Sequence, residues 1–135
     1  MNRVKLPDRR RSWRQKIKME GQTFYLTVGE HESGQPGEVF IDAAKQGTFT
    51  RGVLDALARM TSMALQCGAP LAEVCRALRG LNFPPQGRVE SDPPTFIAGV
   101  SSVADWIARE LEAAYLKPDA DKVAGVESEP WRSGV

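Results

Sequence analysis

The stretch from Gly34 to Gly68 constrains the fold more than any other part of the chain, because four local signals follow one another in it. Gly34 to Gly37 is rich in turn-forming residues, and a short β-prone run, Val39 to Ile41, comes next. A polar loop around Gly47 then leads into apolar residues at helical spacing. The stretch therefore predicts a hairpin turn, a strand, a loop and an amphipathic helix that ends at Gly68.

The helix predicted over residues 50–67 has a pronounced apolar side. Its apolar and small residues recur at intervals of three and four, which indicates one buried face. The residues predicted to be buried on that face are Val53, Leu54, Leu57, Met60, Thr61, Ala64 and Leu65.

Two further strands are predicted before this stretch, Ser12 to Met19 and Gln22 to Gly29, joined by a tight turn at Glu20-Gly21. Their side chains alternate in character, which is typical of a sheet that is buried on one side only. In the first strand Trp13, Gln15, Ile17 and Met19 share one face, and Arg14, Lys16 and Lys18 share the other. With residues 39–41 they form an antiparallel meander of three strands.

The second half of the chain is predicted to be mainly helical. Pro70 suits the first turn of a helix that ends at Gly80. Residues 81–94 contain four prolines and a glycine, so they are predicted to form no regular structure and to serve as a linker or a lid. A third helix is expected over residues 95–116, with Asp105 and Glu110 facing solvent. The predicted class is α+β, with three helices on one face of a three-stranded antiparallel sheet.

Length and charge indicate one domain of ordinary composition. The 135 residues carry a net charge of +1, but eight of the first eighteen residues are basic. We therefore divide the chain into a flexible basic arm (residues 1–11), a domain (residues 12–116) and a disordered tail (residues 117–135). No stretch has the apolar length of a membrane span or the pattern of a signal peptide, so a cytoplasmic protein is expected.

The reactive residue types are too few for a recognisable catalytic or metal site. Cys67 and Cys75 have no neighbouring partners of the kind that zinc requires. His31 is the sole histidine and falls in a predicted hairpin loop, where a surface role is the simpler interpretation. We expect no catalytic residues, no metal, no cofactor and no enzymatic activity of the isolated chain.

The loop before the first long helix is the best candidate for a binding site. Backbone amides at a helix start favour an anion, and basic residues on both sides of the loop add positive charge. The candidate phosphate-binding or nucleotide-binding residues are Lys45, Gly47, Thr48, Thr50 and Arg51. The spacing does not match a P-loop, and a capped helix with two solvated cations is the alternative.

A second candidate surface is basic. It comprises the arm residues Arg9, Arg10 and Arg11 and the strand residues Arg14, Lys16 and Lys18. Such a cluster can contact nucleic acid or an acidic partner through its charge, or it can simply be solvated.

Three segments carry a resemblance to a known family. They are QTFYLTVGEHESGQPGEVFIDAAKQGTF, LQCGAPLAEVCRALRGLNFPPQGRV and SSVADWIARELEAAYL. In this order they resemble the TSCPD-type domain found at the C-terminal end of vitamin B12-dependent (class II) ribonucleotide reductases and as free-standing small proteins. The resemblance covers about residues 16–116. It departs from the family at the Cys-Pro-Asp signature, where Ser101-Ser102-Val103-Ala104-Asp105 stands instead.

The resemblance implies an accessory or regulatory domain that does not itself reduce ribonucleotides. A contribution in trans to the activity of a ribonucleotide reductase is the enzymatic alternative. We expect it to bind a nucleotide or another phosphate-bearing small molecule, or to associate with a class II reductase. A nucleotide-sequestering (sponge) protein and a nucleic-acid-associated protein that uses the basic arm are the alternatives. The apolar helix surface exceeds what three short strands can cover, so a homo-oligomer is also expected.

Overall fold

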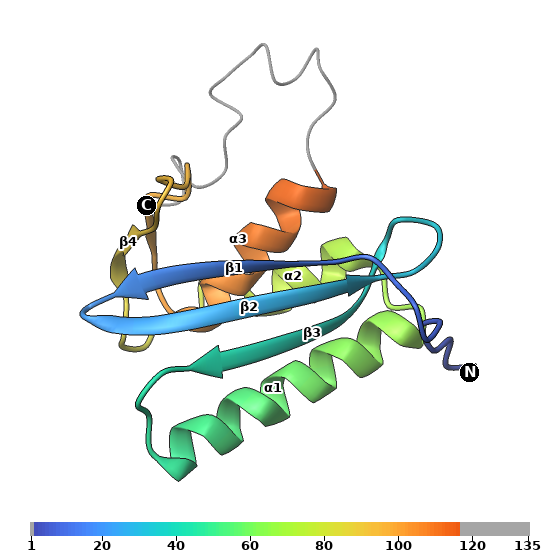
Figure 1. The fold of residues 1–135 in the computed structure, drawn as a ribbon, viewed down its shortest axis with the longest axis horizontal. Helices are drawn as coiled ribbons and strands as arrows, with labels where there is room; N and C mark the ends of the chain where they lie inside the picture. Colours follow the sequence, from blue (N-terminus) through green and yellow to red (C-terminus); the bar gives the residue numbers. More distant parts are fainter. Residues whose placement is uncertain (1, 117–135) are drawn as a thin grey trace.

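The computed structural model describes residues 2–116, so the predicted disordered tail lies outside the described residues. The elements are β1 (Ser12–Met19), β2 (Gln22–Glu30), β3 (Pro36–Ala43), α1 (Thr48–Gln66), α2 (Leu71–Leu78), β4 (Gly87–Glu90), β5 (Gly99–Val100) and α3 (Val103–Tyr115). Antiparallel strands and three helices make up this part of the chain (Figure 1), which confirms the α+β class.

The hairpin between β1 and β2 forms as its sequence predicts. Glu20 and Gly21 both have positive φ, 51° and 76°, as a two-residue type I′ turn requires. The register pairs Ile17 with Phe24. Side chains of like character therefore meet on the same face of the sheet.

The sheet has five strands, in the order β3-β2-β1-β4-β5, where the sequence predicted three. The proline-rich segment expected to lack regular structure contains β4, whose Val89 pairs with Met19 of β1. In turn, β5 pairs with β4 between Gly87 and Val100. The prediction was wrong here because these strands are short and their partners are distant in sequence, so no local pattern reveals them.

The third helix begins later than predicted. Gly99 and Val100 are taken up by β5, and Ser102 is the N-cap of α3. Helix α3 therefore starts at Val103 rather than near residue 95.

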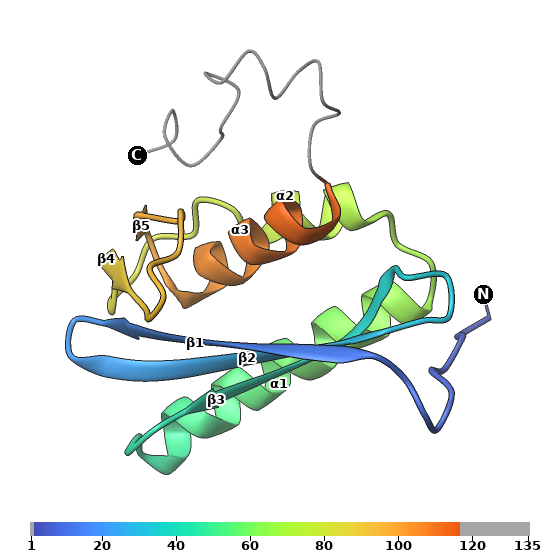
Figure 2. The ribbon, with the colours of Figure 1, turned by 45° about the horizontal axis from the view of Figure 1, so that its top comes forward.

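Helices α2 and α3 lie behind the sheet when the sheet faces the viewer, and α1 runs along its β3 edge (Figure 1). The turned view shows α2 and α3 stacked above the covered face (Figure 2). This face supplies the largest buried side chains of the sheet, namely Ile17, Met19, Phe24, Leu26, Val28 and Val39. No helix of residues 2–116 covers the opposite face, and Arg14, Lys16 and Lys18 are exposed on it, as predicted.

Helix α1 lies along the edge strand β3. The Ser62 hydroxyl accepts a hydrogen bond of 2.9 Å from the Val39 amide, and the Gln66 side chain donates one of 2.8 Å to the Gly37 carbonyl. These contacts cover part of an edge that would otherwise expose unpaired backbone groups. Because α1 lies at the edge, the sheet reaches only part of its apolar surface. Val53 and Met60, which were predicted to be buried, are consequently exposed.

Candidate functional site

The loop between β3 and α1 is held in a defined shape. The Gln46 side-chain amide donates to the Gln22 side-chain oxygen at 2.9 Å, which ties the loop to the start of β2. Lys45 has a φ of 58°, a left-handed conformation that is unfavourable for a residue with a Cβ atom. The left-handed conformation of Lys45 turns the chain from the end of β3 towards α1, and the Gln46–Gln22 hydrogen bond fixes the loop in place.

The start of α1 has no side-chain cap. Gly47 is the N-cap residue, with extended backbone angles (φ −71°, ψ 171°), and its carbonyl accepts the first helical bond from Arg51 at 3.1 Å. Within the described part of the chain, no side chain accepts a hydrogen bond from the amides of the first turn, and that turn contains no acidic residue. Neither Thr48 nor Thr50 caps the helix. The positive end of the helix dipole is therefore not offset by the protein itself.

A cavity of about 500 Å³ opens beside this helix start, between β3 and α1. Its lining comes from both elements: Ile41, Asp42, Ala43, Thr48, Arg51, Gly52, Leu54 and Asp55. Of the five predicted phosphate-binding residues, Thr48 and Arg51 line this cavity. Lys45, Gly47 and Thr50 belong to the adjoining loop and first turn and are not among the lining residues.

The cavity lies where α1 stops covering the edge of β3. The Ala44 amide donates to the Thr23 carbonyl, so alternate residues of β3 bond to β2 and the residues between them face the free edge. Ser62 and Gln66 cover that edge at Val39 and Gly37. By the same alternation, Ile41 and Ala43 turn their backbone groups towards the cavity. The cavity therefore offers backbone donors and acceptors as well as side chains.

The charges in the cavity are mixed. Arg51 makes none of the ion pairs found among residues 2–116, whereas Asp55 is paired with Arg59 at 3.0 Å on the exposed side of α1. Asp42 is exposed at the end of β3. A guanidinium beside uncapped amides suits a phosphate, and carboxylates accept hydrogen bonds from hydroxyl groups. A sugar phosphate can satisfy both kinds of group.

Gly52 is the one glycine in the cavity lining. A Cβ atom built on it meets nothing within 4 Å, so close packing does not require glycine there. Glycine inside a helix lowers stability by roughly 0.5–1 kcal/mol relative to alanine. Sequence reasoning overlooked Gly52, although a glycine in the first turns of a helix next to a basic loop was a visible signal.

The basic arm and the basic strand residues lie away from this cavity. The Val4 amide donates to the Gln66 carbonyl at 2.8 Å, so the arm contacts the far end of α1. Arg9, Arg10 and Arg11 are all exposed, and Arg10 forms an ion pair with Glu38. The structure therefore separates the two predicted surfaces.

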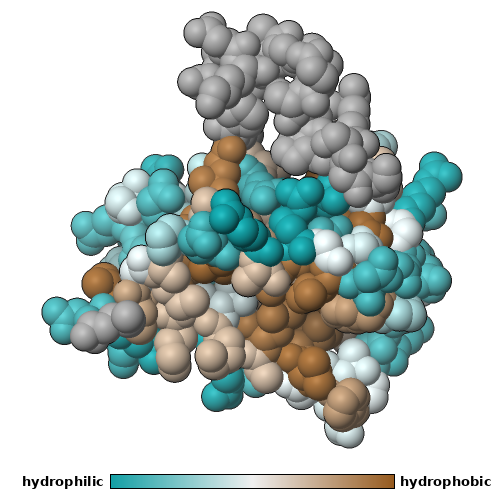
Figure 3. All heavy atoms as spheres, turned by 180° about the vertical axis from the view of Figure 1, so that it is seen from behind, coloured by the Kyte–Doolittle hydropathy of each residue, from teal (hydrophilic) through white to brown (hydrophobic). Residues whose placement is uncertain are grey.

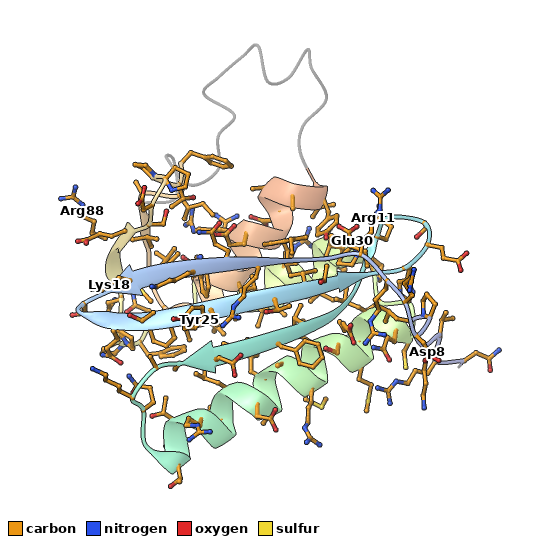
Figure 4. All side chains as sticks on the ribbon, viewed as in Figure 1. Asp8, Arg11, Lys18, Tyr25, Glu30 and Arg88 are labelled. Carbon is orange, nitrogen blue, oxygen red and sulfur yellow. The ribbon has the colours of Figure 1, made fainter. Side chains whose placement is uncertain are left out.

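The strand residues of the basic surface lie on the uncovered face of the sheet. Figure 4 shows Lys18 and Tyr25 on the side of the sheet turned away from the helices. The Arg14 guanidinium lies 4.3 Å from the centre of the Tyr25 ring, and the Lys16 ammonium lies 5.9 Å from it. Exposed cations thus surround a partly buried aromatic ring on this face.

The start of α3 is a second place where sequence reasoning needs correction. Asp105 was expected to face solvent, but it is fully buried. Its carboxylate accepts hydrogen bonds from the Gly80 amide (2.9 Å) and from the Ser101 amide (3.0 Å). Burial alone would raise the pKa of Asp105, but these two bonds and one from Arg109 outweigh it, so the pKa is lowered. A serine three residues before an acid was the available signal, because it is typical of a helix cap.

Glu110 was also expected to face solvent and is also buried. Burial raises the pKa of its carboxyl, and a hydrogen bond of 2.9 Å from the Trp106 indole partly opposes that effect. Burial likewise raises the pKa of the Cys75 thiol to about 12, which keeps the thiol protonated and unreactive. These groups serve the packing of α3 and α2.

Residues 2–116 contain no cluster of three or more histidine, cysteine or acidic side chains that could hold a metal ion. Within the same range, no helix is both long enough and apolar enough to cross a membrane.

The fold and the cavity define a small α+β domain with a ligand-sized opening at a helix start. The family model of the TSCPD domain matches residues 2–115. The chain belongs to this family.

Vitamin B12-dependent ribonucleotide reductases are similar to most of the chain. The reductase of Agrobacterium fabrum is 38% identical over 114 residues and that of Bradyrhizobium diazoefficiens is 37% identical over 114 residues. Each match covers 84% of this chain and 9% of the reductase. The reductase of Rhodopirellula baltica is 35% identical, with 84% of this chain and 11% of the reductase covered. The chain thus spans a small part of the relatives it matches, and no solved structure matches it.

The family relation clarifies the segment that stands roughly in place of the signature. Ser102 is the N-cap of α3, and its hydroxyl accepts a hydrogen bond from the Asp105 amide at 3.0 Å. Val103 and Ala104 between them are buried. In this chain the segment therefore caps α3 and offers no thiol.

Proposed function

We propose that this chain is a ribonucleotide-reductase-related accessory domain that binds a nucleotide between β3 and the start of α1. The observation that carries the proposal is the cavity, where Arg51 and an uncapped helix start lie beside two carboxylates. In the proposed complex, a phosphate contacts the first-turn amides, Arg51 and Lys45. The sugar hydroxyl groups then donate to Asp42 or Asp55.

A thermal-shift screen against ribonucleotides, deoxyribonucleotides and cyclic nucleotides tests this proposal. A ligand that binds only the folded state raises stability by about 2.7 kcal/mol at a hundredfold excess over Kd. We expect a shift for one class of nucleotide. Arg51→Ala should remove the shift, and Arg76→Ala, a change of the same kind at an exposed arginine of α2 outside the cavity, should retain it. Equal shifts for both variants would place the ligand elsewhere.

The relation to the reductases supports a second form of the same function, in which the domain also associates with a class II reductase. A pull-down with a purified vitamin B12-dependent reductase tests this association. If the nucleotide binds tightly and is recovered unchanged, without any reductase association, the chain is better described as a nucleotide-sequestering protein.

One observation favours a different function. Arg14, Lys16 and Lys18 are exposed beside Tyr25 on the uncovered sheet face. Single-stranded nucleic acid binds basic surfaces through phosphate contacts and stacks its bases on aromatic side chains. Binding that weakens steeply with salt and is lost in the Lys16→Ala/Lys18→Ala variant would favour this alternative.

A further inference from the structure

Helix α1 carries an exposed apolar stripe on the side that faces away from the sheet. The stripe residues are the exposed Phe49, Val53, Ala56, Met60 and Met63 and the partly buried C-cap residue Cys67. The most exposed of them are Phe49 (82%) and Met60 (64%). Seen from the helix side, apolar residues gather over the region of α1 (Figure 3). Exposed apolar surface of this extent is typical of an interaction site.

The spacing of the stripe indicates what covers it. Its residues are separated by four, three, four, three and four positions, which is the heptad repeat of a helix that packs against another helix. The residues that face the sheet, Leu54, Ala58, Thr61 and Leu65, form a separate set on the other side of α1. Helix α1 thus has one apolar side for its own sheet and another for a second helix.

We infer that the stripe is the contact between two copies of this chain, with their α1 helices antiparallel. In that arrangement large residues lie opposite smaller ones: Phe49 opposite Cys67, and Met60 opposite Ala56. Along the paired helices, Asp55 of one copy lies at nearly the same position as Arg59 of the second copy. Opposite charges therefore flank the contact between the two α1 helices. A self-complementary surface of this kind is what a two-fold dimer requires.

The antiparallel arrangement has a consequence for the nucleotide site, and this consequence rests on the proposed function. The arm contacts the end of α1, where Arg3 donates to the Gln66 side chain at 2.7 Å. The cavity is lined by residues of the first two turns of α1, between Thr48 and Asp55, which lie about 16–27 Å from Gln66 along the helix at a rise of about 1.5 Å per residue. Within one copy, Arg3 and Lys5 are therefore far from the cavity. In the dimer, the second copy's Arg3 and Lys5 lie near Lys45 and Arg51 and complete the cationic site.

Sedimentation velocity tests the dimer. The wild-type chain should sediment as a dimer, and Met60→Glu should weaken the association at least tenfold. Phe40→Glu is the matched control, because Phe40 is also exposed but lies on the uncovered sheet face. A monomeric wild-type chain overturns the inference, as does a Met60→Glu variant that associates as well as wild type. Circular dichroism establishes that each variant is folded.

Mild oxidation tests the orientation of the two helices. In the antiparallel dimer, Cys67 residues of the two copies are far apart and Cys75 is buried, so the wild type should form no cross-linked dimer. Phe49→Cys should cross-link to Cys67 of the second copy and give a disulfide-bonded dimer on a non-reducing gel. Cross-linking of the wild type through Cys67 would instead show a parallel pair and overturn the arrangement.

A separate readout distinguishes failure of the dimer from failure of the nucleotide site. In the dimer, Arg3→Ala/Lys5→Ala should lower nucleotide affinity about as much as Lys45→Ala does, without changing the sedimentation. A dimer that binds no nucleotide sustains the interface and contradicts the proposed function. A monomer that binds nucleotide sustains the proposed function and contradicts the interface.

Discussion

The starts of α1 and α3 are built in opposite ways. At α3, Ser102 caps the helix, and Asp105 is buried with hydrogen bonds from two amides and from Arg109. At α1, the N-cap is Gly47, no side chain caps the first turn, and a cavity opens beside it. The protein thus satisfies one helix start with its own side chains and leaves the other able to meet a ligand. We attribute stability to the first and binding to the second.

The largest expected loss of stability follows from a change at the capped start of α3. Asp105→Ala leaves the buried Arg109 without its carboxylate partner, and Arg109 already has one nitrogen, Nη1, with no hydrogen-bond partner among the described residues. Removal of one partner of a buried pair costs about 3–5 kcal/mol. Urea unfolding should show this loss. Asp55→Ala, which removes an exposed carboxylate paired at the same spacing on α1, should cost less than about 1 kcal/mol. Similar losses of unfolding free energy for both variants would contradict the claim that the two helix starts differ in their contribution to stability.

The same carboxylate should make the fold sensitive to acid. The pKa of Asp105 is lowered from 3.8 in the folded state. Its contribution to the free energy of unfolding is therefore complete above the unfolded pKa and is lost as pH falls through the folded pKa. The urea midpoint of the wild type should drop below about pH 4. Asp105→Asn should flatten this part of the pH profile, and a profile that stays unchanged would show that Asp105 is not the responsible group.

Glu110 should make the free energy of unfolding depend on pH in the opposite direction from Asp105. Because burial raises the pKa of Glu110 above 4.5, its contribution to stability is present at low pH and is lost as pH rises through the folded pKa. Replacement by glutamine keeps the hydrogen-bond acceptor for Trp106 without the charge. Glu110→Gln should therefore raise the urea midpoint at neutral pH relative to wild type, and a lower midpoint would contradict this sign.

A smaller effect is expected when a hydroxyl is removed at each start. Ser102→Ala should lower the free energy of unfolding by about 1 kcal/mol, because it removes the cap of α3. Thr48→Ala should leave stability almost unchanged, because Thr48 caps nothing. Equal losses in thermal unfolding would indicate that α1 depends on Thr48 in a way that its geometry does not show.

Lys45 offers a test in which stability and binding change in opposite directions. Its positive φ is unfavourable for lysine and acceptable for glycine, so Lys45→Gly should raise the free energy of unfolding by up to about 1 kcal/mol. The same change removes a cation beside the site, so nucleotide affinity should fall. Calorimetric titration combined with thermal unfolding measures both effects. A variant that loses stability and keeps its affinity would contradict both expectations.

The predictability of the molecule from its sequence depends on how local each feature is. The turn at Glu20-Gly21, the alternating faces of β1 and β2 and the end of α1 near Gly68 all follow from neighbouring residues, and the sequence predicts them. Strand β4 depends on its pairing with the distant Met19, and nothing in its own residues indicates a strand.

The starts of α1 and α3 also differ in how far local sequence predicts them. The basic loop before α1 was visible in the sequence as a candidate site, because loop, glycine and cations are contiguous. The cavity was not visible, because it requires the edge of β3 and the position of α1 on that edge. The burial of Asp105 was missed because one of its amide donors, Gly80, is 25 residues away in the sequence, although the Ser102 cap was a local signal. Charge pattern alone cannot distinguish a solvated carboxylate from one that receives backbone hydrogen bonds.

The most direct test of the account is a calorimetric titration of the selected nucleotide into wild type and into Gly47→Asp. This variant gives α1 the kind of cap that α3 already has, and a Cβ atom at Gly47 meets nothing within 4 Å. Aspartate is only a few tenths of a kcal/mol better than glycine as a cap, so stability should stay the same or rise slightly. We predict that nucleotide binding is lost, because the new carboxylate occupies and repels the phosphate position. Unchanged affinity in the folded variant would contradict the claim that the open start of α1 is the binding site.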